Sequence, residues 1–213
     1  MNSLFYFKKS PPRSPSLTKR GRGEIFLFFF FLIQSSAYGG DLSQKVQEAY
    51  RNTPALEARF VQRTYVEILE KEVIEKGTLL LAKPGRFKIS YEGKRERAYI
   101  SDGKRLWIIH PGEKEVIDDI RSQVSPEALT FLGGLGEMER DFQVTEQSLE
   151  KGGKLTLIPH RKDSPFKKII LKIDPKLNLA REAELFPKNG NKTVYRFERM
   201  TVKNDVSGDL FHP

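Results

Sequence analysis

Residues 77–111 read GTLLLAKPGRFKISYEGKRERAYISDGKRLWIIHP, in which short apolar segments are separated by the turn sequences KPGR, EGK and SDGK. Segments of this kind between Gly- and Pro-containing turns are typical of antiparallel β-strands. The stretch holds no nucleophile, metal-ligand cluster or phosphate-binding loop. It therefore predicts an apolar sheet surface, which either is a plain core or holds an apolar ligand.

The same pattern continues on both sides of this stretch and predicts about eleven strands. Short turns join antiparallel neighbours, and a single sheet of that length curls into a barrel or part-barrel rather than staying flat. We therefore expect a mainly β (α+β) fold built on one curved antiparallel sheet. The predicted strands cover residues 56–68, 73–82, 86–92, 95–101, 105–110, 115–120, 141–146, 154–160, 167–174, 179–186 and 193–203.

Two predicted helices are available to cover the open side of this sheet. The first covers residues 41–53, where apolar side chains recur at helical spacing, and Pro54 ends it. The second begins at Ser125-Pro126-Glu127, because Ser caps a helix, Pro fits its first turn and Glu favours its positive end. Glycines that follow residue 132 are expected to keep this second helix short.

Residues 1–39 are typical of a secretory signal peptide. A basic segment, 1–24, precedes nine apolar residues, 25–33, and small residues follow. The apolar run is too short to cross a bilayer, which takes about 20 residues. An uncleaved anchor is the alternative. We expect cleavage after Ala37 or Gly39, which leaves one domain, 40–213, outside the cytoplasm.

The charge and the cysteine count exclude several classes of protein. Six of the 37 basic residues and one of the 28 acidic residues lie within 1–39, so the remaining net charge is +4 rather than +9. Nucleic acid is therefore not an expected partner. The absence of cysteine excludes a disulfide scaffold, a thiol nucleophile and an N-terminal lipid-modified cysteine.

No arrangement of residues suggests catalysis or metal binding. The histidines at 110, 160 and 212 are isolated, whereas metal sites need clustered ligands. Asp118 and Asp119 are neighbours in a predicted strand and would point to opposite faces, so they would not share a proton. Motifs for a serine nucleophile and a phosphate loop are missing. We expect no catalytic residues, no metal, no cofactor and no enzymatic activity.

Three segments occur in order along the chain: LEARFVQ at 56–62, GTLLLAKPGRF at 77–87 and ISDGKRLWIIHP at 100–111, followed by the weak helix near Phe131. With these segments the chain resembles the periplasmic outer-membrane lipoprotein carrier (LolA) family. The order of the segments after a signal peptide is more specific than any single segment. The resemblance implies a half-open barrel of eleven strands covered by a helical lid, whose concave face holds the acyl chains of lipoproteins.

The resemblance also implies a route for the cargo. A lipoprotein-releasing transporter complex in the inner membrane would supply acylated lipoproteins, and a lipoprotein receptor in the outer membrane would accept them from the chain, an expected monomer. That receptor resembles the carrier in fold but carries a lipidated cysteine, and this chain has no cysteine. The alternative function is a non-transporting module of the same fold that senses lipid or lipoprotein.

Strand alternation assigns the candidate cavity. A two-residue turn at Asp102-Gly103 places Tyr99, Leu106 and Ile108 on one face. Trp107 and Ile109 then lie on the convex face, where an apolar pair is unfavourable, so the opposite register stays open at 106–109. Each residue taken singly could instead be plain core. The predicted cavity residues are Phe60, Leu79, Leu81, Phe87, Ile89, Tyr91, Tyr99, Leu106 and Ile108, and the predicted lid residues are Leu129, Phe131 and Leu132.

Family resemblance further implies a latch on the lid. An arginine just before the proline of the 83–84 step bonds to lid carbonyls in the family, and here that position is Lys83. Lysine lacks the planar fork of donors, so the latch is expected to be looser, and nearby Arg86 is expected to face away. Some members carry a further C-terminal strand that opposes back-transfer. Because this sequence ends with residues 209–213, we expect no such strand here.

Overall fold

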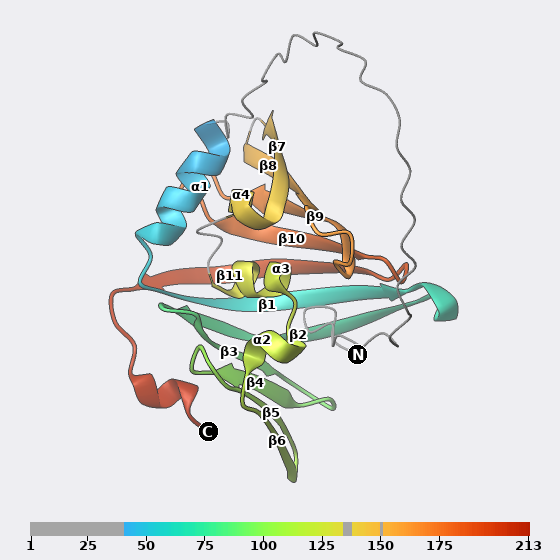
Figure 1. Cartoon of the computed structure of the whole chain (residues 1–213), viewed down its shortest axis with the longest axis vertical. Coiled ribbons are helices and arrows are strands. Elements are labelled where there is room, and N and C mark those ends of the chain that lie inside the picture. The colour runs from blue at the N-terminus through green and yellow to red at the C-terminus, as the bar shows by residue number, and fades with distance from the viewer. Residues whose placement is uncertain (1–40, 134–137, 150) are drawn as a thin grey trace, which may run out of the picture. The chain divides into compact units, whose positions relative to one another are not determined.

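The computed structural model describes residues 41–133, 138–149 and 151–213, so the predicted signal peptide lies outside the described residues. One open antiparallel sheet of eleven strands dominates it, as predicted (Figure 1). The strand order is β6-β5-β4-β3-β2-β1-β11-β10-β9-β8-β7. The strands are β1 (Ala55–Val66), β2 (Lys71–Ala82), β3 (Arg86–Tyr91), β4 (Arg97–Ser101), β5 (Leu106–His110), β6 (Glu113–Ile117), β7 (Phe142–Leu149), β8 (Gly152–Pro159), β9 (Phe166–Ile173), β10 (Ala180–Pro187) and β11 (Lys192–Lys203).

The sheet consists of two meanders that meet at its centre. We call β1–β6 the N-terminal arm and β7–β11 the C-terminal arm; within each arm, every strand pairs with its neighbour in the chain. The first and last strands, β1 and β11, pair with each other and join the arms. Phe60 lies opposite Phe197 in this pairing, and a register shift falls between Glu57 and Arg59.

Helix α1 (Asp41–Arg51) packs against β7 and β8 of the C-terminal arm. The Glu146 carboxylate in β7 caps it, because it accepts hydrogen bonds from the backbone N–H groups of Leu42 (3.2 Å) and Ser43 (2.8 Å). At the other end, the Tyr50 hydroxyl accepts a hydrogen bond from the Ala180 N–H at 3.3 Å. Burial raises the pKa of Tyr50 to about 12. The helix is thus fixed at both ends.

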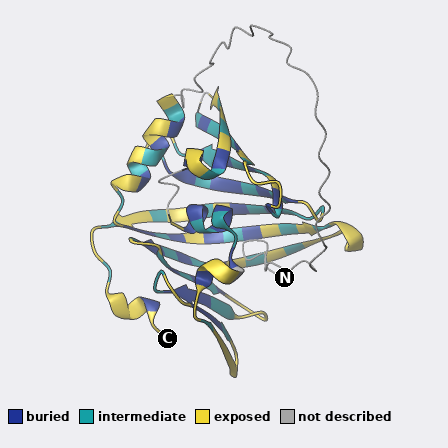
Figure 2. Cartoon of the chain, viewed as in Figure 1, coloured by how far each residue is buried: buried dark blue, intermediate teal, exposed yellow. Residues whose placement is uncertain are grey.

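Short helices connect the two arms of the sheet. Helix α2 (Ile120–Gln123), α3 (Pro126–Leu132) and α4 (Met138–Asp141) follow β6. Two 3₁₀ turns also occur: η1 (Glu67–Leu69) between β1 and β2, and η2 (Gly208–Phe211) near the end of the chain. Figure 2 shows α3 mostly buried, whereas η1 and most of η2 are exposed.

The sixth strand was predicted to reach residue 120, and this prediction was wrong because the strand ends at Ile117. The pair Gly152-Gly153 begins strand β8. A Cβ on Gly153 would lie 2.4 Å from a methyl carbon of Leu42, so the glycine lets α1 approach the sheet. Asp119 caps α2 by accepting a hydrogen bond from the Arg121 N–H at 3.0 Å.

Apolar clusters lie on both faces of the sheet. The larger cluster covers the concave face and joins both arms to α1 and α3. The smaller cluster lies on the opposite, convex face of the N-terminal arm and consists of Ala55, Ala82, Ile100, Trp107 and Phe211. β2, β4 and β5 therefore carry apolar residues on both faces, which explains why strand 106–109 has no clean alternation of apolar and polar residues.

Candidate functional site

The nine residues predicted to line a cavity lie together on the concave face. Leu79, Ile89, Tyr99 and Ile108 are direct partners across β2, β3, β4 and β5, so they form one row across the N-terminal arm. All nine belong to the larger cluster, and each is 9% exposed or less. The register chosen at 106–109 is confirmed, because Ile108 pairs with Tyr99 and Leu106 with Ser101.

The C-terminal arm supplies the other half of this concave face. No cavity residue was predicted in this arm. Its inward residues also form cross-strand rows, since Leu155 pairs with Leu171 and Leu171 with Ala183. Apolar alternation in 154–160, 167–174 and 179–186 carried the signal that would have found them. The missed inward residues are Leu155, Leu157, Ile169, Leu171, Ala183, Leu185, Tyr195 and Phe197.

Helix α3 covers the concave face as a lid. The Ser125 hydroxyl caps it by accepting a hydrogen bond from the Ala128 N–H at 3.3 Å, as the sequence predicted. Phe131 and Leu132 are buried in the larger cluster, and Leu129 packs against it. The structure therefore brings all three predicted lid residues to the concave face.

The space beneath the lid is nearly filled. Phe131 stacks on Phe197 of β11, with ring centroids 6.5 Å apart. A remaining cavity of about 10 Å³ holds one water molecule at most. A larger apolar ligand can enter this cavity only when the lid side chains leave it. The cavity is lined by Tyr50, Leu56, Ala58, Leu79, Leu81, Phe131, Ala180, Phe197 and Met200.

One hydrogen bond attaches the lid to the start of the C-terminal arm. The Thr130 hydroxyl of α3 donates to the Asp141 carboxylate, which ends α4. Burial raises the pKa of Asp141, but the hydrogen bonds from Arg140 and Thr130 outweigh it and hold that pKa below its ordinary value. The ionised carboxylate is therefore the form that this lid contact favours.

A carboxylate on the lid is buried without a hydrogen bond. Glu127 is 1% exposed, and neither of its carboxylate oxygens has a hydrogen-bond partner among the residues that the structure describes. Its place in the first turn of α3 stabilises negative charge by only about 1 kcal/mol or less. Arg161 supplies a nearby positive charge, because the charge of Glu127 contributes to raising the pKa of Arg161. The carboxylate is therefore buried without hydrogen bonds but lies within reach of an opposite charge.

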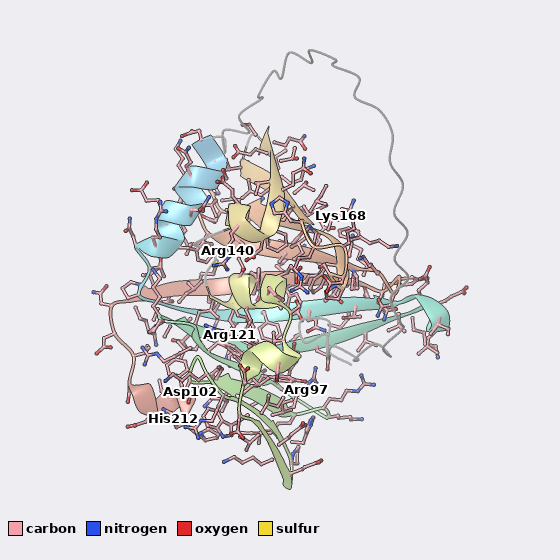
Figure 3. All side chains as sticks on the ribbon, in the orientation of Figure 1. Arg97, Asp102, Arg121, Arg140, Lys168 and His212 are labelled. Carbon is pink, nitrogen blue, oxygen red and sulfur yellow. The ribbon has the colours of Figure 1, made fainter. Side chains whose placement is uncertain are left out.

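Polar side chains close one end of the concave face. The Tyr91 hydroxyl donates to Gln62 Oε1 at 2.7 Å and lies 3.5 Å from the Tyr195 hydroxyl. Arg97, labelled in Figure 3, lies 3.8 Å from the centre of the Tyr91 ring and pairs with Glu75 at 2.8 Å. The apolar surface therefore stops at this network.

The residue predicted as a lid latch bonds elsewhere in the closed structure. Lys83 Nζ donates to the carbonyl of Arg51, at the end of α1, and the Lys83 backbone N–H donates to Pro54 at 3.0 Å. Burial lowers the pKa of Lys83, and the nearby charge of Arg51 lowers it further. Lys83 shares a small cleft with the lid residues Leu132 and Gly133, so its latch role stays a prediction.

Arg86 faces the convex side, where the C-terminal segment covers the smaller cluster. Its guanidinium donates to the Lys83 carbonyl at 2.7 Å and lies 5.0 Å from the centre of the Phe211 ring. Phe211 is fully buried and leaves Trp107 only 7% exposed. His212, labelled in Figure 3, meets Trp107 edge to face at 5.7 Å. The C-terminal segment thus covers the apolar pair Trp107 and Ile109 on the convex face. Strand alternation could not predict this cover.

Neither a membrane-spanning helix nor a metal-binding cluster occurs among the described residues. In residues 41–133, 138–149 and 151–213, no helix combines the length and apolarity that a membrane span requires. The same residues contain no group of three or more His, Cys, Asp or Glu side chains that could hold a metal ion.

Comparison with known proteins identifies the family. The model for "outer membrane lipoprotein carrier protein LolA" matches residues 51–213. An outer-membrane lipoprotein carrier protein of Alkalilimnicola ehrlichii is 28% identical over 183 residues, which is 84% of this chain and 79% of that protein. One from Nitrosospira multiformis is 22% identical and covers 87% of this chain and 90% of its own length.

Solved structures are similar as well. A LolA superfamily protein of Nitrosomonas europaea aligns with a TM-score of 0.48 at 14% identity, over 81% of this chain and 96% of its own. The matched family consists of carrier or binding proteins and not of enzymes. Because the family model covers most of the described residues, the chain belongs to the family of outer membrane lipoprotein carrier proteins.

Proposed function

We propose that the chain is a periplasmic chaperone that binds the acyl chains of lipoproteins and carries them from the inner membrane to the outer membrane. The observation that supports this most is the concave face, where buried apolar residues from both arms of the sheet lie under a short lid helix. Acyl chains in water cost about 0.8 kcal/mol per exposed CH₂, so a carrier needs such a surface.

Exchange of apolar contacts would let this surface both hold and release its cargo. In the closed structure, Phe131 packs against Phe197 where acyl chains would lie. Cargo that enters replaces lid contacts by acyl contacts of the same kind, and such contacts are not directional. The net free energy of exchange is therefore small.

The remaining parts of the proposal concern the route. Residues 1–39 would act as a signal peptide that is removed on export, and 40–213 would be the carrier domain. A lipoprotein-releasing transporter of the inner membrane would supply cargo, and an outer-membrane receptor would accept it. The relatives' names refer to outer-membrane lipoproteins, which supports acylated lipoproteins as the cargo class.

Mass spectrometry of the exported protein with its cargo tests this function. We expect acylated lipoproteins to copurify in about one-to-one ratio, and a Leu79→Asp variant on the concave face to lose them. Lys168→Asp, on the outer face of β9, is the matched control. A protein that binds no acylated lipoprotein, even when offered one in detergent, would rule the proposal out.

A further inference from the structure

The hairpin of β1 and β2 extends beyond the neighbouring strand β3. Strands β1 and β2 stay paired as far as Val66 and Lys71, but β2 pairs with β3 only from Gly77 onward. Residues 71–76 therefore have a strand partner on one side alone. The turn η1 forms the tip of this hairpin and projects at the right of Figure 1.

The tip carries the most exposed large apolar side chains in the described part of the chain. Ile68 is 90% exposed and Leu69 is 61% exposed. Tyr65 and Ile74, just behind them on the two strands, are 45% and 51% exposed. Single exposed apolar residues are ordinary, but four at one projecting tip indicate a contact surface.

The tip is held in a defined conformation. The Glu67 N–H donates to Asn191 Oδ1 at 3.1 Å, in the turn between β10 and β11. The Glu67 carboxylate lies against Gly190 of the same turn, where a side chain would occupy its place. Glu70 closes the turn with φ +48° and donates its N–H to the Glu67 carbonyl at 3.1 Å. These contacts turn the Glu67 charge toward the sheet and leave Ile68 and Leu69 outside it.

The size and charge of the tip favour a bilayer over a protein as its binding partner. A stable protein interface buries about 1,000 Å² or more, whereas one turn of 3₁₀ helix offers two fully projecting side chains. A lipid surface closes around a small apolar projection, and one as small as this gives weak, reversible binding. Glu67, Glu70 and Glu72 outnumber Lys71 at the tip, so a zwitterionic surface fits better than an anionic one.

We propose that Ile68 and Leu69 form a membrane-contact tip, which enters the headgroup region of a zwitterionic bilayer while cargo is exchanged. The purpose of this membrane contact rests on the proposed function, but the contact itself depends only on the side chains of the tip. Insertion of the tip of the long β1–β2 hairpin would hold the curved sheet at the membrane. The protein would need no lipid anchor of its own for this contact.

The chain lacks cysteine, so one introduced thiol can report on the tip without ambiguity. We would label an Ile68→Cys variant of the exported protein with an environment-sensitive dye and add phosphatidylcholine–phosphatidylethanolamine vesicles. We expect a blue shift and increased emission at position 68. A Leu177→Cys variant, at a turn residue 40% exposed, is the matched control and should not change. Absence of a shift at 68, or an equal shift at both positions, would overturn the proposal.

Vesicle flotation of Ile68→Ser/Leu69→Ser gives a second test. We expect vesicle binding to fall about tenfold or more while the melting temperature is unchanged, since both side chains are exposed. Copurification of acylated cargo should persist in this variant. Vesicle binding without any cargo binding would refute the proposed function alone. Unchanged flotation, or a photo-crosslinker at position 68 that labels protein instead of lipid, would refute the tip.

Discussion

The ring of Phe131 in the lid helix stacks on the ring of Phe197 in the last strand, with centroids 6.5 Å apart and planes inclined by 29°. Phe197 in turn stacks on Tyr195 at 6.4 Å, beside the polar network that ends the apolar surface. In the closed lid, the ring of Phe131 thus lies against the centre of the sheet.

Replacement of Phe131 by alanine should loosen the lid. We expect Phe131→Ala to lower the free energy of unfolding by about 3 kcal/mol, since a buried ring is lost, and to speed the uptake of acylated cargo. Urea unfolding and the time course of cargo binding measure the two effects. Phe186→Ala, on the outer face of β10 beside Lys168 and Lys192, is the control and should leave uptake unchanged. Slower uptake in Phe131→Ala would contradict the lid model.

Removal of the Glu127 carboxylate, which is buried without hydrogen bonds, should have the opposite effect. Glu127→Met keeps the volume and removes a buried carboxylate, so we expect a gain of about 2 kcal/mol in unfolding free energy and slower cargo uptake. The exposed neighbour Glu139→Met in α4 serves as control. If the Glu127 variant unfolds more easily than the wild type, the carboxylate has a stabilising partner after all.

The lid contact at Asp141 should make stability depend on pH. Because the pKa of Asp141 is lowered in the folded protein, its contribution is complete above the ordinary Asp pKa of about 4 and is lost as pH falls through the lower folded value. At pH 6 the melting temperature of Asp141→Asn should therefore be lower than that of the wild type. The difference between the two melting temperatures should shrink below about pH 4. A difference that does not vary between pH 6 and pH 2 would argue against this contact.

Lys83 should affect release more than stability. Lys83→Leu removes a partly exposed hydrogen bond to the end of α1, which we expect to cost about 1 kcal/mol or less in urea unfolding. Transfer of lipoprotein to acceptor membranes should change in rate, and Lys83→Arg should restore it. Lys104→Leu, at an exposed turn, is the matched control. Unchanged transfer in Lys83→Leu would count against a latch.

The cover over the convex face can be followed by fluorescence. Trp107 is the single tryptophan of the chain and packs in the cluster that Phe211 completes. We expect Phe211→Ala to shift the emission to the red and to cost about 3 kcal/mol of stability. Leu210→Ala, whose side chain is exposed, should do neither. An unshifted spectrum in Phe211→Ala would mean that the segment does not cover Trp107.

Much of this fold follows from local sequence. Alternation and turn residues located the eleven strands, and Ser125 located the start of the lid, because these signals act between near neighbours in the chain. The face of Tyr99 and Ile108 was also predictable, since one tight turn fixes their register. Local rules therefore place one half of the concave face.

Contacts between distant residues were not predictable in this way. Phe211 covers Trp107 from the far end of the chain, and Leu42 of α1 packs on Gly153 of β8. Lys83 bonds to the carbonyl of Arg51 at the end of α1. Each of these depends on how separate elements pack, which neither periodicity nor a resemblance in short segments determines.

The pairing of β1 with β11 has a consequence for how the protein folds. Each arm is a meander of local hairpins, which form quickly, whereas this one pairing joins residues near both ends of the chain. Until β11 has emerged, β1 has an unpaired edge bearing Phe60 and Leu56, which is prone to aggregation. We therefore expect joining of the arms to be the slow step of folding, and the unjoined N-terminal arm to be the species that most needs protection until β11 pairs with β1.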